Sequence, residues 1–395
     1  MKYALIIPDG AADTPAEDLG GKTPFEVADM PNISWIAQNG RLGTVRNVPA
    51  GMPAGSDVAT MSLLGYNPRE HYTGRAPLEA AAQHLQIGPD DWIFRVNFVT
   101  IVDDVMEDNS AGHISTEEAR ALIEDLNATV APPSVTFYSG VSYRHLMVVT
   151  NDLDVKTTAP HDILSRSTTE HLPTGPGSEM LRDIMSAART VLAEHEINAT
   201  RRDLGDNAAT DIWLWGEGKM PTLPSFESRY GKVGKMITAV DLLRGLAALI
   251  GWECIEVEGA TGYLDTNYAG KGAAAVAALD DCDLVCVHVE APDEAGHNAD
   301  AKGKVASIEQ IDEHIVGPLL ERLKAEGDDW RILVLPDHPT PCAIRTHTAE
   351  PVPFALAGKR IESVMHGKFT EQDAATGDLQ IDRGWELMEY FLTVR

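Results

Sequence analysis

The sequence predicts an α/β protein with a mostly parallel sheet, helices on both faces of that sheet, and an inserted α+β domain. After about residue 232, short apolar runs alternate with amphipathic helical segments, a pattern typical of a parallel sheet covered by helices. The start of the chain carries the same pattern, whereas its character changes between residues 79 and 231. We therefore expect one domain of residues 1–78 and 232–395, interrupted by a second domain of residues 79–231.

The first segment of the chain contains two predicted strands and two predicted helices. The first helix ends at Gly40, and glycine is a frequent helix terminator. A loop rich in Pro and Gly over residues 48–55 then brings Ser56 to the start of a further run with helical spacing. In order, the predicted elements are a strand over 3–8, a helix over 31–40, a strand over 41–46 and a helix over 57–64.

The middle segment mixes strand-like runs with long amphipathic helices, as expected of a self-contained α+β unit. Its strands are predicted over 94–102, 134–138, 145–149 and 212–216, and its helices over 115–126 and 177–195. Residues 220–225 are the expected linker back to the first domain, because they are rich in proline.

The last segment alternates strand and helix throughout. Its strands are predicted over 234–240, 253–257, 284–289 and 330–335, and its helices over 241–250, 268–279 and 302–325. In open α/β sheets, binding sites gather beyond the carboxyl ends of the strands. Residues that directly follow these strands are therefore candidates for a shared site.

The composition excludes several classes of function. The chain has 395 residues, 44% of them hydrophobic, and a formal net charge of −28, which argues against a nucleic-acid-binding or anionic-membrane surface. No apolar stretch approaches the ~18 residues of a membrane span. An anionic substrate would need local cations, either bound metals or a small cluster of Arg and Lys.

Cysteine usage and the N-terminus predict a cytoplasmic protein. Four cysteines in so long a chain do not form a disulfide framework. Cys282 and Cys286 flank strand-like sequence, where buried thiols are expected. The first apolar run is too short for a signal peptide, so we expect a reducing, cytoplasmic setting. The oligomeric state is left open.

Metal-ligand residue types follow three of the predicted strands. They are Asp9 after the first strand, Asp293 and His297 after the strand that ends at residue 289, and Asp337 and His338 after the strand that ends at residue 335. The carboxyl ends of parallel strands meet at one edge of a sheet, so these side chains are expected to come together. Paired cations held in this way can clamp the attacking and the leaving oxygen of a phosphoryl transfer.

Each of these residues also has an ordinary structural explanation. Asp293 and His297 would share one helix face and could bind one metal, but Asp293 could equally cap the helix. Asp337 and His338 could be plain loop residues, as could His347. Only their joint placement favours a metal centre.

Ser56 is the candidate nucleophile. A glycine before it and an apolar helix after it place its hydroxyl at a helix N-terminus, where unpaired amides and the helix dipole favour an anion. The alternative is a plain N-cap serine. A divalent cation would supply the activation that an isolated serine lacks.

Several motifs occur along the chain in a characteristic order. They are Pro8-Asp-Gly10, Ala54-Gly-Ser-Asp57, Tyr72-Thr-Gly-Arg75, Gly259-Ala-Thr-Gly-Tyr-Leu-Asp-Thr-Asn267, Ala291-Pro-Asp-Glu-Ala-Gly-His297, Pro336-Asp-His-Pro-Thr-Pro341 and Thr346-His-Thr348. These motifs resemble those of the alkaline phosphatase superfamily, and more narrowly those of cofactor-independent (2,3-bisphosphoglycerate-independent) phosphoglycerate mutases of the archaeal-type branch. The resemblance covers nearly the whole chain and implies an alkaline-phosphatase-like fold for the first domain.

The resemblance implies two divalent metal sites and no 2,3-bisphosphoglycerate. One metal would be bound by Asp293, His297 and His347. The other would be bound by Asp9, Ser56, Asp337 and His338. Histidines combined with carboxylates suit Mn, Zn or Co, and Mg is a further option.

The resemblance also implies a phosphoserine mechanism with two further catalytic residues. Ser56 would be the nucleophile. Lys271 would be the cation beside it, although an exposed helix lysine is the alternative. His113, in a motif similar to the family's substrate-domain histidine motif, would contact the substrate or shuttle a proton.

The inserted domain is expected to bind the substrate. Bidentate guanidinium groups match phosphate and carboxylate, so arginines are the first candidates, with structural ion pairs as their alternative. The candidates are Arg75, Arg95, Arg144 and Asp162, with His161 and Arg166 as weaker ones.

The predicted activity is the interconversion of 3-phosphoglycerate and 2-phosphoglycerate, a step of glycolysis, with a small phosphorylated substrate as the partner. Glycerate would stay trapped while it reorients, so the insert is expected to act as a lid that excludes water. The alternatives are a homoserine kinase or a phosphatase that uses the same serine centre, and a metal-stabilised binding protein without activity.

Overall fold

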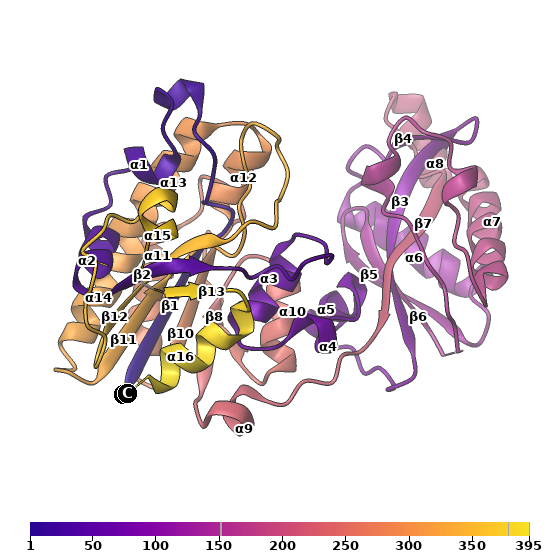
Figure 1. Ribbon diagram of the computed structural model, residues 1–395. Helices are drawn as coiled ribbons and strands as arrows, with labels where there is room; N and C mark the ends of the chain where they lie inside the picture. The colour runs from indigo at the N-terminus through magenta and orange to yellow at the C-terminus, as the bar shows by residue number, and fades with distance from the viewer. Residues whose placement is uncertain (151, 378, 395) are drawn as a thin grey trace. The chain divides into compact units, whose positions relative to one another are not determined.

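The computed structural model describes residues 1–150, 152–377 and 379–394, which divide into two compact units. Unit 1 comprises Met1–Tyr72 and Thr222–Arg395, and unit 2 comprises Thr73–Pro221 (Figure 1). The sequence placed these boundaries six and ten residues later, at 78/79 and 231/232. The first boundary moves because helix α5 (Arg75–Ala82) packs on strands of unit 2.

Unit 1 is built on an eight-stranded sheet with the order β13-β2-β12-β11-β1-β10-β8-β9. Strand β1 lies between β10 and β11 and is parallel to both, and β8 and β9 continue the parallel part. The strands are β1 (Lys2–Pro8), β2 (Arg41–Val45), β8 (Gly234–Ile237), β9 (Glu253–Cys254), β10 (Leu284–Val289), β11 (Trp330–Val334), β12 (Val352–Gly358) and β13 (Leu379–Ile381).

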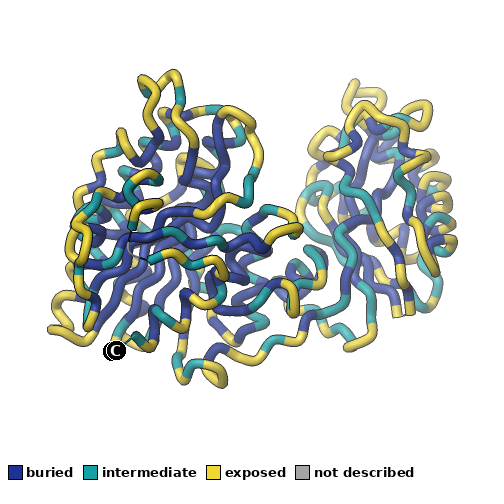
Figure 2. Tube along the Cα trace, viewed as in Figure 1, coloured by how far each residue is buried: buried dark blue, intermediate teal, exposed yellow. Residues whose placement is uncertain are grey.

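Helices cover both faces of this sheet, and its central strands are buried (Figure 2). Helices α2, α11 and α14 pack on one face, whereas α10 and α16 cover the other. The helices of unit 1 are α1 (Pro24–Val27), α2 (Pro31–Asn39), α3 (Ser56–Leu63), α4 (Pro68–His71), α9 (Phe226–Tyr230), α10 (Asp241–Leu249), α11 (Tyr268–Ala278), α12 (Ala291–His297), α13 (Ala301–Ile311), α14 (Gly317–Lys324), α15 (Glu371–Ala375) and α16 (Leu387–Thr393), with short turns η1 (Glu17–Leu19) and η5 (Gly384–Glu386).

Unit 2 is built on a five-stranded antiparallel sheet in which β3 pairs with β4, β6 and β7. Helices α6 and α7 pack on one face of this sheet, and α5 packs on β3 and β7. The strands are β3 (Trp92–Val102), β4 (Val105–Asp108), β5 (Val135–Val141), β6 (Arg144–Val149) and β7 (Asp211–Lys219). The helices are α5 (Arg75–Ala82), α6 (Thr116–Thr129), α7 (Ser178–Glu194) and α8 (Glu196–Leu204), with short turns η2 (Pro160–Ile163) and η3 (Thr169–His171).

The predicted fold class is confirmed, although several elements differ in detail and strands β4 and β13 were not predicted. The helix expected over 302–325 is interrupted, because a π-helical turn, η4 (Asp312–Val316), separates α13 from α14. Strand β12 was not predicted, and it runs antiparallel to both of its neighbours. No described helix is both long and apolar enough to cross a membrane.

Candidate metal centre

Three buried aspartates lie at the carboxyl ends of three adjacent strands in unit 1. Asp9 follows β1, Asp337 lies just beyond β11, and Asp293 lies in α12, which begins two residues after β10. Because β10, β1 and β11 are parallel neighbours, their carboxyl ends meet at one edge of the sheet. The fold thus brings three carboxylates together from positions far apart in the sequence.

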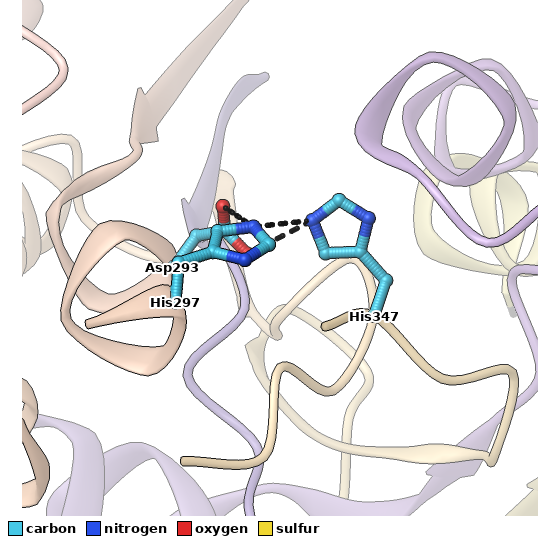
Figure 3. A group of neighbouring side chains, drawn as sticks. All are labelled: Asp293, His297 and His347. Atoms are coloured by element: carbon cyan, nitrogen blue, oxygen red, sulfur yellow. Dashed lines mark hydrogen bonds and ion pairs between the residues drawn. The ribbon is translucent and has the colours of Figure 1, made fainter. Parts of the chain in front are cut away.

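The first candidate metal-binding group consists of Asp293, His297 and His347 (Figure 3). His297 Nε2 lies 3.2 Å from Asp293 Oδ2, and His347 Nε2 lies 3.3 Å from Asp293 Oδ1. The outer nitrogens of both rings are hydrogen-bonded to backbone carbonyls, His297 Nδ1 to Arg345 at 3.0 Å and His347 Nδ1 to Ala54 at 3.1 Å. These carbonyls orient the rings so that both Nε2 atoms point at the carboxylate.

The second candidate metal-binding group is centred on Asp9 and joins two sets that could hold an ion. One set is Asp9, His288 and Asp337, and the other is Asp9, Asp293 and His338, so Asp293 is common to both candidate groups. His338 Nε2 lies 3.6 Å from Asp9 Oδ1 and 3.4 Å from Asp337 Oδ2, while His288 Nε2 lies 3.0 Å from Asp9 Oδ2. Asp337 Oδ1 accepts hydrogen bonds from the backbone N–H groups of Gly10 and His338. One oxygen of Asp337 is thus fixed by the backbone, and the other faces the histidine.

Ser56 lies at this second group. Its hydroxyl is 3.2 Å from Asp9 Oδ2 and 3.2 Å from His338 Nε2. The N-cap of α3 is Gly55, and Ser56 is the first helical residue, with no side-chain capping bond in this helix. The N-cap explanation for Ser56 is therefore wrong, and its hydroxyl is directed at candidate ligands instead.

The alternative role of Asp293 is also wrong, because Glu290 is the N-cap of α12 and Asp293 lies inside the first turn. The lack of a side chain at Gly10 leaves space for the Asp293 carboxylate. The Gly10 backbone has φ +61°, and a Cβ there would come within 2.5 Å of Asp293 Oδ1. Both conditions require glycine directly after Asp9.

The electrostatics of the three carboxylates favour bound cations. Burial, together with the charges of Asp337 and Asp293, raises the pKa of Asp9 well above its usual range. Burial opposes ionisation of Asp293 as well, but hydrogen bonds with His297 and His347 outweigh it and hold its pKa well below the usual range. Asp9 Oδ1 and Asp337 Oδ2 are buried without a hydrogen-bond partner among the described residues. These residues fit two divalent cations, which would supply the missing positive charge.

His288 was missed from the sequence. It lies in the middle of the apolar run Leu284–Val289, is fully buried, and is a member of the second group. Burial, the largest influence, lowers its pKa to about 4, which keeps the ring neutral as a ligand requires. A histidine within an otherwise apolar strand was the available signal.

Lys271 is buried on α11 and is not an exposed helix lysine. Its Nζ has no hydrogen-bond partner among the described residues. Burial lowers its pKa to about 8, against the opposing charge of Glu290, and burial raises the pKa of Glu290 to about 7. Lys271 also lowers the pKa of His288, so its ammonium group lies near the metal-binding residues.

Unit 2 gathers a basic cluster, defined by Arg75, Arg95, Arg144 and His161, in which Arg95 and His161 lie against Trp215. The Arg95 guanidinium lies 4.1 Å from the centre of the Trp215 ring, and the His161 ring lies 5.2 Å from it. Burial lowers the pKa of Arg95, the charge of Glu79 opposes this, and the nearby Arg75 and Arg144 lower it further. Four of the residues considered from the sequence are therefore close neighbours.

The other predicted substrate contacts lie near this cluster or are exposed. Asp162 Oδ1 lies 3.8 Å from His161 Nε2, and both side chains are largely exposed. The exposed His113 has φ +50° and packs edge-on against Tyr143, with 5.8 Å between ring centres. The same tyrosine lies under Arg144, at 5.7 Å. The hydrogen bonds of Arg166 to Met106 and Ile163 are made by its backbone.

Comparison with known proteins identifies the relatives of this chain. The family model of 2,3-bisphosphoglycerate-independent phosphoglycerate mutase matches residues 37–198. A protein of that name from Methanothrix thermoacetophila is 48% identical over 392 residues, which cover 99% of this chain and all of the relative. Among solved structures, a protein from Pyrococcus horikoshii has a TM-score of 0.84 at 30% identity, covering 99% of this chain and 97% of that one. The cofactor-independent phosphoglycerate mutase from Thermoplasma acidophilum has a TM-score of 0.68 at 28% identity, covering 99% of both chains.

Proposed function

Because the chain belongs to the 2,3-bisphosphoglycerate-independent phosphoglycerate mutase family, we propose that it interconverts 3-phosphoglycerate and 2-phosphoglycerate with Ser56 as the carrier of the phosphoryl group. As the family name states, 2,3-bisphosphoglycerate takes no part. The observation that carries the proposal is the Ser56 hydroxyl, 3.2 Å from both Asp9 and His338 at the first turn of α3. A structural metal site would have no use for a nucleophile held in this position.

Ser56 would act in two half-reactions. In the first, Ser56 Oγ attacks the phosphorus of the substrate, the bond between that phosphorus and the substrate oxygen breaks, and phosphoserine forms while the proton of the Ser56 hydroxyl is passed to the freed substrate oxygen. In the second, the other hydroxyl of glycerate attacks the phosphoserine, the bond to Ser56 Oγ breaks, and the proton of that hydroxyl is returned to Ser56 Oγ. The hydroxyl of Ser56 donates to Asp9 Oδ2, which orients its free lone pairs for attack.

The two groups of ligands would hold two divalent cations, for which Mn, Zn and Co are the first candidates and Mg is a further option. One would be held by Asp293, His297 and His347, the other by Asp9, Asp337, His338 and Ser56. When bound, such cations offset the negative charge that gathers on a transferred phosphoryl group. Lys271 adds a positive charge to the same centre, because its buried ammonium group lacks a competing partner among the described residues.

The basic cluster of unit 2 would bind the anionic groups of the substrate. Burial is the main cause of the lowered pKa of Arg95, and the like charges of Arg75 and Arg144 lower that pKa further. A phosphate or carboxylate would offset these like charges. Asp162 and His113 would complete the contacts, with His113 as the residue that shuttles a proton. Retention of glycerate by the insert stays a prediction.

A cytoplasmic location is part of the same proposal, and all four cysteines are free thiols.

The proposal is tested by incubating the purified protein with 3-phosphoglycerate and Mn²⁺ in the absence of ATP. We expect 2-phosphoglycerate to form, and a peptide that contains Ser56 to gain about 80 Da, the mass of one phosphoryl group, when turnover is trapped. Absence of product with every divalent metal tested would contradict the mutase activity.

The homoserine kinase alternative makes a different demand. It requires ATP and yields phosphohomoserine, so the same preparation can be offered ATP and homoserine in parallel. The relatives reported above support the mutase and not this alternative. ATP-dependent phosphorylation of homoserine without mutase activity would reverse the assignment.

A further inference from the structure

We propose that Thr340 is a positioning residue that ties the two metal-binding groups together, and that the buried Lys304 holds Thr340 in place. This inference rests on the metal centre of the proposed function. Thr340 is fully buried in the loop that follows β11, two residues after His338. Its hydroxyl lies between a ligand of one group and a ligand of the other.

The Thr340 hydroxyl makes two polar contacts, and the chemistry of its neighbours fixes their direction. Oγ1 lies 2.5 Å from Asp293 Oδ1 and 3.3 Å from His338 Nδ1. His338 presents Nε2 to Ser56 and Asp9, so that nitrogen must be unprotonated to act as a ligand and Nδ1 carries the hydrogen. Nδ1–H therefore donates to Thr340, whose own proton goes to Asp293.

A side chain without a hydroxyl cannot make this relay. It would leave His338 Nδ1–H without the threonine acceptor and Asp293 Oδ1 without its shortest donor. The Asp293 carboxylate would then be oriented by its two histidines alone, and these are its partners in the same metal-binding group. Thr340 thus supplies a contact that links the two groups through hydrogen bonds.

Lys304 fixes the main chain of Thr340. Its ammonium group donates to Thr340 O at 2.6 Å, to Gly10 O at 3.0 Å and to Asp13 Oδ2 at 2.8 Å. All three hydrogens of the ammonium group are therefore used, and the Lys304 and Asp13 side chains are buried to 0% and 1% exposure. A single lysine on α13 thereby joins the loop after β1 to the loop after β11.

Two glycines leave the space that Thr340 occupies. A Cβ at Gly10 would lie 2.5 Å from Thr340 Oγ1, and a Cβ at Gly296 would lie 2.4 Å from Thr340 O. Neither distance is compatible with a side chain, since atoms at van der Waals contact are ~3.5 Å apart. Thr340 is therefore confined from the side of β1 and from the side of α12, and its hydroxyl has little freedom to move.

The test compares Co²⁺ binding by the wild type, Thr340→Val and Thr340→Ser, because Co²⁺ reports its ligand geometry by visible absorption. We expect Thr340→Val to bind at least one Co²⁺ about 10- to 100-fold more weakly and to change the absorption spectrum, as loss of a residue that supports metal ligands does elsewhere. Thr340→Ser keeps the hydroxyl and should restore both affinity and spectrum. Thr340→Ala serves as a second variant without the hydroxyl or added bulk, should the valine variant not fold.

Thr60→Val is the matched control. Thr60 is also fully buried, and its hydroxyl has no partner among the described residues, so its replacement should leave Co²⁺ binding unchanged. Wild-type affinity and spectrum in Thr340→Val would overturn the inference, and so would a lower unfolding temperature of the metal-free variant with unchanged Co²⁺ binding. Absence of Co²⁺ binding by the wild type would instead overturn the metal centre itself, and the inference with it.

Discussion

The metal centre of unit 1 and the basic cluster of unit 2 organise charge in opposite ways. In the metal centre, three aspartates are buried and fixed by histidines and backbone amides. In the basic cluster, Arg144 and His161 are exposed, and the buried Arg95 lies against Trp215. The first arrangement is incomplete without cations, and the second favours an anion. In the proposed function, unit 1 holds permanent charges in place, whereas unit 2 admits and releases a charged molecule.

The largest expected effect comes from the nucleophile of unit 1. Ser56→Ala should lower kcat by at least about 10⁴-fold, because it removes the atom that carries the phosphoryl group. The aspartates and histidines remain, so the variant should still bind divalent metal, as a calorimetric titration can measure. Substantial turnover by Ser56→Ala would remove the phosphoserine mechanism and leave the two units without their proposed division of roles.

Removal of metal should lower the stability of unit 1 and leave the stability of unit 2 unchanged. Bound cations stabilise the folded state by roughly 4 kcal/mol when they are present at a thousand times their dissociation constant. Chelation should therefore weaken hydrogen-exchange protection in β1, β10 and β11. Protection in β3, β6 and β7 should stay unchanged, which makes unit 2 the internal control. Equal loss of protection in both units would contradict the assignment of the metal centre to unit 1.

The sequence could predict the candidate metal centre because its aspartates follow strands that run in the same direction. Asp9, Asp293 and Asp337 follow strands of a parallel sheet, and such strands end at one edge. His288 obeys no such rule, because a histidine inside an apolar strand looks the same whether it is a ligand or a core residue. The structure places His288 opposite Ile7 on β1, two residues before Asp9. The His288 Nε2 atom lies 3.0 Å from Asp9 Oδ2, which identifies the ring as part of the candidate site.

The residues of the basic cluster were candidates from the sequence, but the sequence did not predict that they lie close together. Arg95 faces Trp215 because β3 and β7 pair in the register that sets these two residues opposite each other, and register cannot be read from composition. Strand β12 was missed as well, and it contains Pro353, a residue that is disfavoured within a sheet. Pro353 pairs with Thr44 on β2 and lies beyond the part of β12 that pairs with β11.

Protonation of a buried histidine in unit 2 should lower the stability of that unit by a smaller amount, and bound metal should not change this effect. His145 on β6 is buried, and burial lowers its pKa from 6.5 to about 4. Above pH 6.5 the ring is neutral in both states, so it has no effect on stability. As the pH falls from 6.5 towards 4, the unfolded chain takes up a proton that the folded chain refuses, and stability falls by up to roughly 3 kcal/mol.

Hydrogen exchange of β6 in the metal-loaded protein measures this loss. His145→Asn cannot titrate but retains an acceptor for the Gly140 N–H that His145 Nδ1 binds at 3.0 Å. Its protection should depend less steeply on pH than that of the wild type. Parallel pH profiles of the two proteins would show that His145 is not the group responsible.

The smallest effect is expected from the exposed arginine of the basic cluster. Arg144→Gln removes a positive charge that lies near Arg95 and over Tyr143. Because Arg144 is exposed, the replacement should not disturb the buried residues around it. A charged hydrogen bond to an anion contributes ~1.5 kcal/mol or more, so KM for 3-phosphoglycerate should rise about tenfold with kcat little changed. Arg202→Gln is the matched control, because Arg202 is an exposed arginine of unit 2 whose guanidinium group donates to the carbonyl of Ala193. A fall in kcat without a change in KM would mean that Arg144 acts on the transferred group, and the contrast between a unit that holds charge and a unit that admits it would no longer hold.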